Sequence, residues 1–297
     1  MQIETLDLHY RGVPRVIASY LVDGPDSPVL VETGPGSTLP TLLDALNDLG
    51  VSPADIRHVL VTHIHLDHAG AAGWWARQGA TVHVHPFGAP HLIDPGKLIA
   101  SATRIYGDEM DTLWGEILPA PEDRIVPVED GDVLEVGGLS FTVVETPGHA
   151  RHHHVYQVGD IAFTGDAAGI KLPGSPWIDV PAPPPEFDLE AWTQTIDKIR
   201  HLECSTLYPT HYGATHEVDN QLDGLQVALV EAVDFVRSMM DEGFDHEEMA
   251  EGYGQRLQDR FAGLRLSPEL MQAFEFANPM AMSVTGISRY VRKLAEA

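Results

Sequence analysis

The alternation of apolar and polar positions divides the 297-residue chain into a β-rich front part and a helical end. Short apolar runs bounded by Gly, Pro, Asp or Asn are typical of strands. They occur at residues 3–8, 15–22, 29–32, 56–62 and 81–85, and again at 125–128, 133–136, 139–144, 154–158, 161–164 and 206–208. Apolar residues recur at helical spacing at 39–49 and 74–78, and again in a helix that Asp188 can cap.

The first five runs open as an antiparallel meander and continue in an alternating β-α-β-α-β order. Residues 86–124 break this rhythm and predict an insertion of two or three helices, around 89–94, 98–106 and 109–118. The second series of strands resembles the first third of the chain. The pattern therefore predicts two β-rich halves packed as a sandwich.

From about residue 217 the spacing becomes helical, over residues 220–242, 246–261, 268–277 and 280–295. Ser267 before Pro268 is a favourable helix start, because serine caps the helix and proline suits its first turn. We therefore expect a domain at 1–215, with its insertion at about 86–124, and an α-helical C-terminal region at 216–297.

Net charge narrows the range of partners. The chain carries 44 acidic and 18 basic residues, a net charge of −26. Such a surface repels phosphate backbones and anionic membranes, so we expect neither a nucleic-acid nor a membrane partner. The start of the chain has no basic segment followed by an apolar one, and no apolar run reaches about 18 residues. A cytoplasmic protein is the expectation.

The candidate chemistry is concentrated at residues 62–68, read as THIHLDH. His63 and His65 alternate after an apolar β-run, so on an extended strand they share one face. A turn at Leu66 must then bring Asp67 and His68 round. Two groups on a strand and two on the following turn could serve two adjacent metal ions rather than one.

Three further ligand-type residues follow later strands. His149 comes after a Pro-Gly turn, Asp166 after a strand and a glycine, and His211 after Pro209 and Thr210. Imidazole and carboxylate ligands suit zinc, and also iron or manganese. The single cysteine, Cys204, excludes both an intrachain disulfide and a thiolate zinc cluster.

The motifs THIHLDH, TPGH, FTGD and PTH occur in the order found in the metallo-β-lactamase superfamily, and the chain resembles a member of it. The resemblance implies an α+β fold, a four-layer αβ/βα sandwich, with the helical insertion and helical C-terminal region as additions. It implies a first metal held by His63, His65 and His149 and a second held by Asp67, His68 and His211. Asp166 would bridge them.

The resemblance further implies hydrolysis by a metal-bridging hydroxide, with two divalent ions, zinc expected and iron or manganese as alternatives. Asp67 and Asp166 are the catalytic candidates, because Asp67 could also pass a proton to the leaving group. Many relatives carry an aspartate where this chain has Glu32, and that aspartate orients a ligand histidine. A glutamate is one methylene longer, so we expect an adjusted loop there.

Other candidates are weighed against ordinary structural roles. His153, in the run 152–154, could support the site or face substrate, or could be exposed; His83 and His85 are expected to be structural. Tyr212 could bond a substrate oxygen or simply pack. The candidates for the pocket wall are Tyr106, Trp114 and Trp177, and those for contact with an anionic substrate, or for surface ion pairs, are Lys97 and Arg104.

We therefore expect a hydrolase of an ester, thioester or lactone of a small molecule, with a homodimer left open. The helical C-terminal region resembles the hydroxyacylglutathione hydrolase and lactonase branch, although no basic glutathione-binding cluster is evident. The alternatives are a mononuclear iron enzyme resembling persulfide dioxygenases, using His63, His149 and Asp166, and a metal-binding module without turnover. The absence of an export signal disfavours β-lactam hydrolysis.

Overall fold

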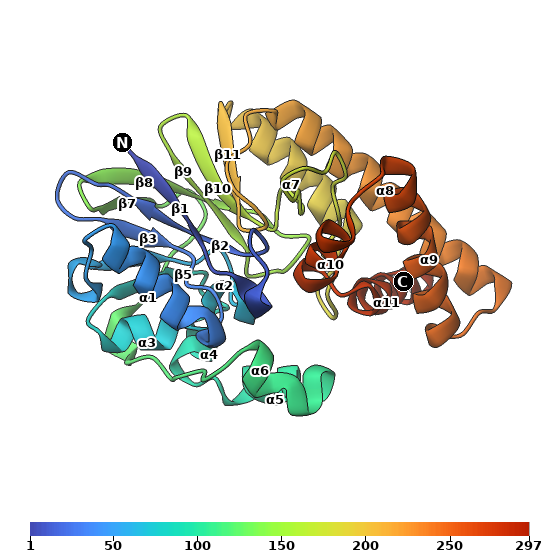
Figure 1. Cartoon of the computed structure of the whole chain (residues 1–297), viewed down its shortest axis with the longest axis horizontal. Helices are drawn as coiled ribbons and strands as arrows, with labels where there is room; N and C mark the ends of the chain where they lie inside the picture. Colours follow the sequence, from blue (N-terminus) through green and yellow to red (C-terminus); the bar gives the residue numbers. More distant parts are fainter. Residues whose placement is uncertain (297) are drawn as a thin grey trace.

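The computed structural model describes residues 1–296 and contains two facing β-sheets with helices on their outer sides (Figure 1). The predicted α+β, four-layer αβ/βα architecture is confirmed, with both helical additions. The sheets account for the two series of apolar runs in the sequence. The division into domains 1–215 and 216–297 stays a prediction.

The first sheet contains six strands in chain order. Its first three strands are antiparallel, as the expected meander requires, and the last four are mutually parallel. Parallel neighbours end at the same edge of a sheet, which brings the loops after them together. The strands are β1 (Ile3–Asp7), β2 (Ala18–Val22), β3 (Val29–Val31), β4 (His58–Leu60), β5 (Thr81–Val84) and β6 (Ile125–Pro127); α1 (Leu39–Asp48) and α3 (Ala72–Arg77) connect them.

The second sheet has the order β11-β10-β9-β8-β7, antiparallel except for the parallel pair β10 and β11. Helix α7 (Leu189–His201) precedes β11, and Asp188 caps it by accepting from the Ala191 amide at 2.9 Å. The strands are β7 (Val133–Val136), β8 (Leu139–Glu145), β9 (His154–Val158), β10 (Ile161–Gly165) and β11 (Thr206–Pro209).

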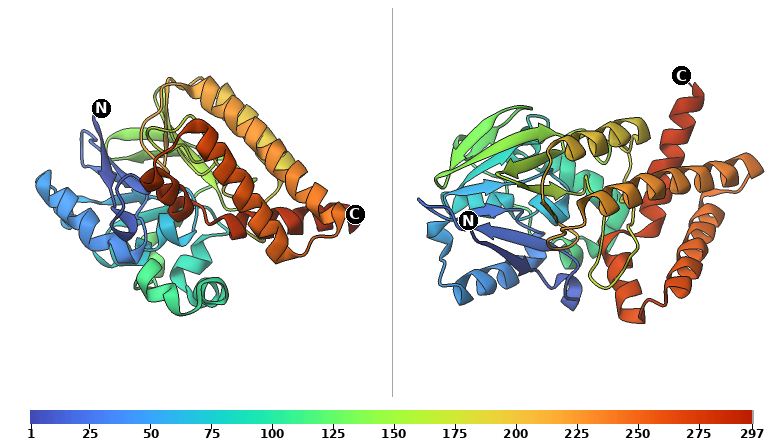
Figure 2. Two further views of the ribbon diagram at one scale, coloured as in Figure 1. Left: turned by 45° about the vertical axis from the view of Figure 1, so that its right-hand side comes forward. Right: turned by 90° about the horizontal axis from the view of Figure 1, so that it is seen from above.

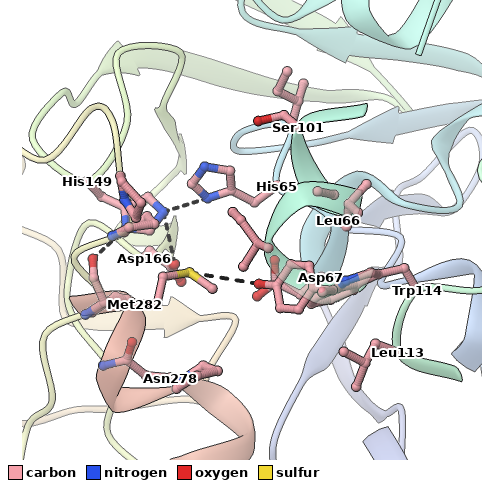
Figure 3. Close-up of a pocket in the computed structure, with 18 of the residues that line it drawn as sticks. His65, Leu66, Asp67, Ser101, Leu113, Trp114, His149, Asp166, Asn278 and Met282 are labelled. Atoms are coloured by element: carbon pink, nitrogen blue, oxygen red, sulfur yellow. Dashed lines mark hydrogen bonds and ion pairs between the residues drawn. The ribbon is translucent and has the colours of Figure 1, made fainter. Parts of the chain in front are cut away.

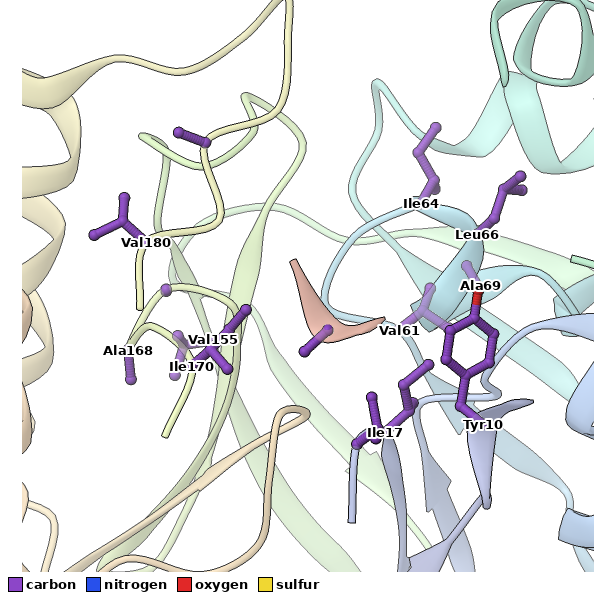
Figure 4. Close-up of a cluster of buried hydrophobic side chains, with 14 of the residues drawn as sticks. Tyr10, Ile17, Val61, Ile64, Leu66, Ala69, Val155, Ala168, Ile170 and Val180 are labelled. Atoms are coloured by element: carbon purple, nitrogen blue, oxygen red, sulfur yellow. The ribbon is translucent and has the colours of Figure 1, made fainter. Parts of the chain in front are cut away.

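The core between the sheets combines branched aliphatic side chains with large aromatic ones, all of them buried. Tyr20, Phe141, Tyr156 and Phe163 are each no more than 1% exposed. The Tyr156 hydroxyl donates across to the Val61 carbonyl of the opposite half at 3.1 Å, which satisfies a buried polar atom and ties the halves together. A second, larger apolar cluster packs the outer helices onto the β-rich part, and Figure 4 shows a portion of it with side chains from both halves.

The insertion forms α4 (Ala89–Ile93), α5 (Gly96–Tyr106) and α6 (Met110–Leu113). The third helix ends at Leu113 and is therefore shorter than the predicted 109–118. The chain leaves the helix there because it packs against the loop before α1. There the Ser37 amide donates to the Trp114 carbonyl at 3.1 Å. The insertion is thus attached to a loop that starts near the end of β3.

The C-terminal region is helical from Val218 and gathers on one side of the sheets (Figure 2). Ser267 caps its third helix as expected, accepting from the Leu270 amide at 3.3 Å. In the part of the chain that the structure describes, no helix combines the length and apolar character needed to cross a membrane. The helices are α8 (Val218–Glu242), α9 (His246–Leu264), α10 (Pro268–Ala277) and α11 (Met280–Glu296).

The junction of α10 and α11 is bonded to a segment of the β-rich part. Asn278 Nδ2 donates to Asp179 Oδ2 at 2.8 Å and to the Val180 carbonyl at 3.0 Å. Ser283 Oγ lies 3.1 Å from the same carbonyl. Gly286 permits this approach, since a Cβ added there would lie 2.0 Å from the Ala182 carbonyl oxygen.

This close approach predicts that Gly286→Ala destabilises the protein by about 1–3 kcal/mol through overpacking. Gly263→Ala, in α9, is the matched control, because a Cβ there meets nothing within 4 Å. The control should be neutral or stabilising by up to about 1 kcal/mol. Urea unfolding of both variants measures the difference, and an unchanged midpoint for Gly286→Ala would exclude the contact.

Candidate metal centre

The THIHLDH segment forms the rim of the site because the chain turns sharply after β4. His63 and His65 lie in the extended stretch, and α2 (Leu66–Ala69) is a single helical turn that carries Asp67 and His68. The His68 amide donates to the His65 carbonyl at 3.0 Å, which closes that turn. The expected turn at Leu66 is therefore present, and all four side chains reach one place.

Three imidazoles form the first group of ligand-type atoms. His65 Nδ1 lies 2.9 Å from both His63 Nε2 and His149 Nε2, and the last two atoms are 3.2 Å apart. Tetrahedral zinc with bonds of about 2.0–2.1 Å places its ligand atoms about 3.3 Å apart. Burial lowers the pKa of all three histidines, which keeps the imidazoles neutral as metal ligands must be.

Asp67, His68 and His211 form the second group. Asp67 Oδ2 lies 3.3 Å from His211 Nε2 and 3.5 Å from His68 Nε2. Burial opposes charge on His68, but the Asp67 and Asp166 carboxylates raise the pKa of His68 well above its usual value. The field at this position therefore favours a cation, either a proton or a metal ion.

The Asp166 carboxylate lies between the two groups. Oδ2 is 3.2 Å from His149 Nε2 in the first group, and Oδ1 is 3.4 Å from His68 Nε2 in the second. Burial by itself raises the pKa of Asp166. The imidazoles of His68 and His149 lower this pKa by more than burial raises it, so that the pKa of Asp166 lies well below its usual value. An ionised carboxylate with one oxygen towards each group has the geometry of a bridging ligand.

Unsatisfied buried atoms provide the test of whether a metal fits. Among the described residues, His68 Nε2, His211 Nε2 and Asp166 Oδ1 are buried without a hydrogen-bond partner. Such atoms are rare in native proteins, and here Asp166 Oδ1 lies 3.4 Å from His68 Nε2 and 3.7 Å from His211 Nε2. Together with the two ligand groups, they fit a divalent-metal centre.

Backbone and hydroxyl groups hold the far side of three of the imidazoles. His149 Nδ1 donates to the Pro181 carbonyl at 2.8 Å, and His211 Nδ1 donates to the Val16 carbonyl at 2.7 Å. His63 Nδ1 lies 3.0 Å from Thr62 Oγ1. These bonds fix the tautomer, so that in each ring Nε2 is left as the ligand atom.

Glu32 connects the two groups from beneath. Its buried carboxylate lies 3.3 Å from His68 Nδ1 and accepts from Thr210 Oγ1 at 3.2 Å. It also accepts from Thr62 Oγ1, whose oxygen is thereby left to accept from His63 Nδ1. The backbone of Glu32 has a φ of 63°, uncommon for a residue other than glycine, so this loop has an unusual course.

His153 lies beneath the centre and is fully buried, which excludes the surface alternative. Its Nδ1 lies 2.8 Å from Thr146 Oγ1, and its Nε2 accepts from the Asp166 amide at 3.2 Å. It therefore supports the loop that carries the bridging carboxylate. Tyr212 packs against both apolar clusters and does not line the cavity described below, so its placement favours packing over substrate contact.

A cavity of about 950 Å³ opens directly above the centre (Figure 3). Its walls come from the metal-site loops, the insertion and the α10–α11 junction. Of the expected wall residues, Tyr106 and Trp114 line it, whereas Trp177 lies under the Arg260 guanidinium at 4.3 Å. Of the two candidates for contact with an anionic substrate, Lys97 lines the cavity and Arg104 does not. Sequence reasoning missed Tyr10, Phe276 and Met282, which carry no motif and reach the cavity only through the fold.

The fold and the two ligand groups define a metal-dependent protein of the αβ/βα sandwich class. The sequence model Lactamase_B, described as the metallo-beta-lactamase superfamily, matches residues 12–211, more than half of the chain. The chain therefore belongs to the metallo-beta-lactamase superfamily. The matched segment contains all seven ligand-type residues.

Individual proteins resemble the chain over different shares of their length. The chain is 26% identical to metallo-beta-lactamase fold-containing protein ST1585 of Sulfurisphaera tokodaii, over 67% of this chain and 74% of that protein. It is 26% identical to an atrochrysone carboxyl ACP thioesterase of Aspergillus fumigatus, over 69% of this chain but only 39% of the thioesterase. The crystal structure of TTHA1429 from Thermus thermophilus covers 99% of this chain and is itself covered to 94%, with a TM-score of 0.71 and 21% identity.

The hydrogen bonds of Glu32 predict that Glu32→Gln weakens metal binding about 10–100-fold. The substitution removes the negative charge beside His68, and it places an amide donor where Oε2 accepts from the Thr62 amide. Glu122→Gln, an exposed glutamate remote from these bonds, is the matched control and should bind metal as the unmodified protein does. Competition titration against a chromophoric chelator measures the affinity. Equal affinities in the two variants would show that Glu32 does not position the ligands.

Proposed function

We propose that this protein is a metallohydrolase that uses two divalent metal ions, zinc being expected and iron or manganese the alternatives, to cleave an ester, thioester or lactone of a small molecule. The observation that carries the proposal is the Asp166 carboxylate, which presents one oxygen to each of two three-residue ligand groups at the floor of a large cavity. His63, His65 and His149 would hold one ion, and Asp67, His68 and His211 the other.

Bound there, the ions would supply a nucleophile from water at neutral pH and polarise the substrate carbonyl. The protein's own side chains determine where in the cavity the substrate carbonyl would react. Asp67 and Asp166 both line the cavity, so they hold their charge next to the reacting carbonyl. Asp67, which is partly exposed, is placed to pass a proton to the leaving group.

The names of relatives support a hydrolytic reading. One relative is a thioesterase, and one solved structure of similar fold is a B3 metallo-beta-lactamase with an active-site glutamic acid, at 22% identity and a TM-score of 0.51. A complete second group disfavours the iron dioxygenase alternative, which needs only His63, His149 and Asp166. The hydroxyacylglutathione hydrolase or lactonase branch, a cytoplasmic location and a homodimer stay predictions.

Metal removal provides the direct test. Protein stripped by a chelator should lose at least about 100-fold in kcat/KM on a panel of ester, thioester and lactone substrates, and activity should return with two equivalents of zinc per chain. One iron per chain with sulfur-dependent oxygen uptake would establish the dioxygenase instead. Full metal loading without turnover on the whole panel would establish a binding module.

The assignment of the second group predicts that His211→Ala holds one metal ion instead of two, because the ring nitrogen nearest Asp67 is lost. Tyr212→Phe, at the adjacent position, is the matched control and should retain two. Metal content after gel filtration measures the stoichiometry. Two ions in His211→Ala would show that the second site does not depend on this imidazole.

A further inference from the structure

The cavity above the metal centre is much larger than a reacting carbonyl requires. Its volume of about 950 Å³ lies near the top of the range found for pockets that enclose drug-sized ligands. The insertion contributes Ser101 and Leu113 to one wall, and the C-terminal region contributes Asn278 and Met282 to another (Figure 3). The Tyr106 hydroxyl reaches Met282 Sδ at 3.8 Å across the gap. A substrate in this space would therefore contact both additions to the β-sandwich.

The wall beside Asp67 is aromatic. The Tyr10 ring stacks on Trp114 with centroids 6.0 Å apart, and the Tyr106 ring meets Trp114 edge-on at 5.1 Å. Burial, reinforced by the nearby Asp67 carboxylate, raises the pKa of both tyrosines, so their rings stay neutral. The rest of the lining near the centre is also largely apolar and includes Ile17, Ile64, Leu66, Leu98, Leu113 and Phe276.

The charged side chains of the lining do not form a site for an anion. Arg151 is paired with Glu186 at 2.8 Å, and the Arg11 guanidinium lies over the Phe276 ring at 4.0 Å. Lys97 is exposed on α5, and Glu109 and Glu275 add negative charge to the same lining. With a net charge of −26 on the whole chain, a carboxylate or phosphate on the substrate would meet repulsion and find no clustered cations.

We infer that the part of the substrate that does not react is bulky, apolar and uncharged, and that it lies in the chamber between α5, Trp114 and the α10–α11 junction. This inference rests on the proposed function and names the substrate class within it: apolar acyl esters, thioesters or lactones. Of the predicted hydroxyacylglutathione hydrolase or lactonase branch, it favours the lactonase side over glutathione thioesters, and it disfavours coenzyme A thioesters. Apolar surface buried in the chamber would drive selection, because each methylene transferred from water favours binding about fourfold.

A series of nitrophenyl esters tests the inference on the zinc-loaded full chain. From acetate to octanoate, kcat/KM should rise about fourfold for each added methylene group until the chamber is filled. The adipate monoester, which matches hexanoate in length but ends in a carboxylate, should react at least about tenfold more slowly than hexanoate. A flat series, or an adipate ester as fast as hexanoate, would overturn the inference while leaving hydrolysis established.

Ser101→Trp and Ala100→Trp provide matched variants on α5. Both positions are exposed on the same helix, but only Ser101 lines the chamber. Ser101→Trp should lower the ratio of octanoate to acetate kcat/KM at least about tenfold, because the indole occupies space the longer chain needs. Ala100→Trp should leave both rates as they are. An unchanged ratio in Ser101→Trp would place the acyl chain elsewhere.

Binding of 2-decanone, an uncharged ketone that cannot be hydrolysed, separates the two claims. Calorimetry should show binding to the zinc-loaded protein that Ser101→Trp weakens at least about tenfold and Ala100→Trp does not change. If no ester, thioester or lactone is cleaved and this pattern holds, the proposed function is wrong and the apolar chamber is supported. If esters are cleaved and the ketone does not bind, the chamber inference is wrong and the function stands.

Discussion

The convergence of buried imidazole and carboxylate groups on one small volume is the constraint on which the structure depends. His63, His65 and His149 bring three ring nitrogens within 3.2 Å of each other, where no arrangement of protons satisfies them all. Asp166 and the second group add ionised oxygens and unpartnered nitrogens. A cation shared among them turns this cost into stabilisation, so we expect folding of the loops and metal binding to be coupled.

Hydrogen bonds also connect the metal centre to the helical C-terminal region. Pro181 orients His149 through its carbonyl, and the neighbouring Val180 carbonyl is held by Asn278 and Ser283 from the α10–α11 junction. One short segment thus links a metal ligand to the wall of the cavity. The helices that shape the substrate chamber therefore also help to position an imidazole of the metal site, and changes in one are expected to affect the other.

The grouping of the seven ligand-type residues followed from the resemblance to the metallo-β-lactamase superfamily. Local pattern by itself was enough to predict two packed β-rich halves with ligand-type residues at strand ends, because strand alternation and the THIHLDH motif act over a few residues. It could not predict that Thr62 and Thr210 both reach Glu32, since this depends on how β3, β4 and β11 end relative to one another. The cavity was harder still: Tyr10 and Met282 are 272 positions apart and carry no periodic signal. Such contacts arise only from tertiary packing.

The central claim, a two-ion centre bridged by Asp166, is tested most directly by anomalous X-ray diffraction from crystals of the zinc-loaded protein. The account predicts two peaks at the zinc edge, one among His63, His65 and His149 and one among Asp67, His68 and His211, with the Asp166 carboxylate between them. A single peak held by His63, His149 and Asp166, with the second group empty at saturating zinc, would contradict it.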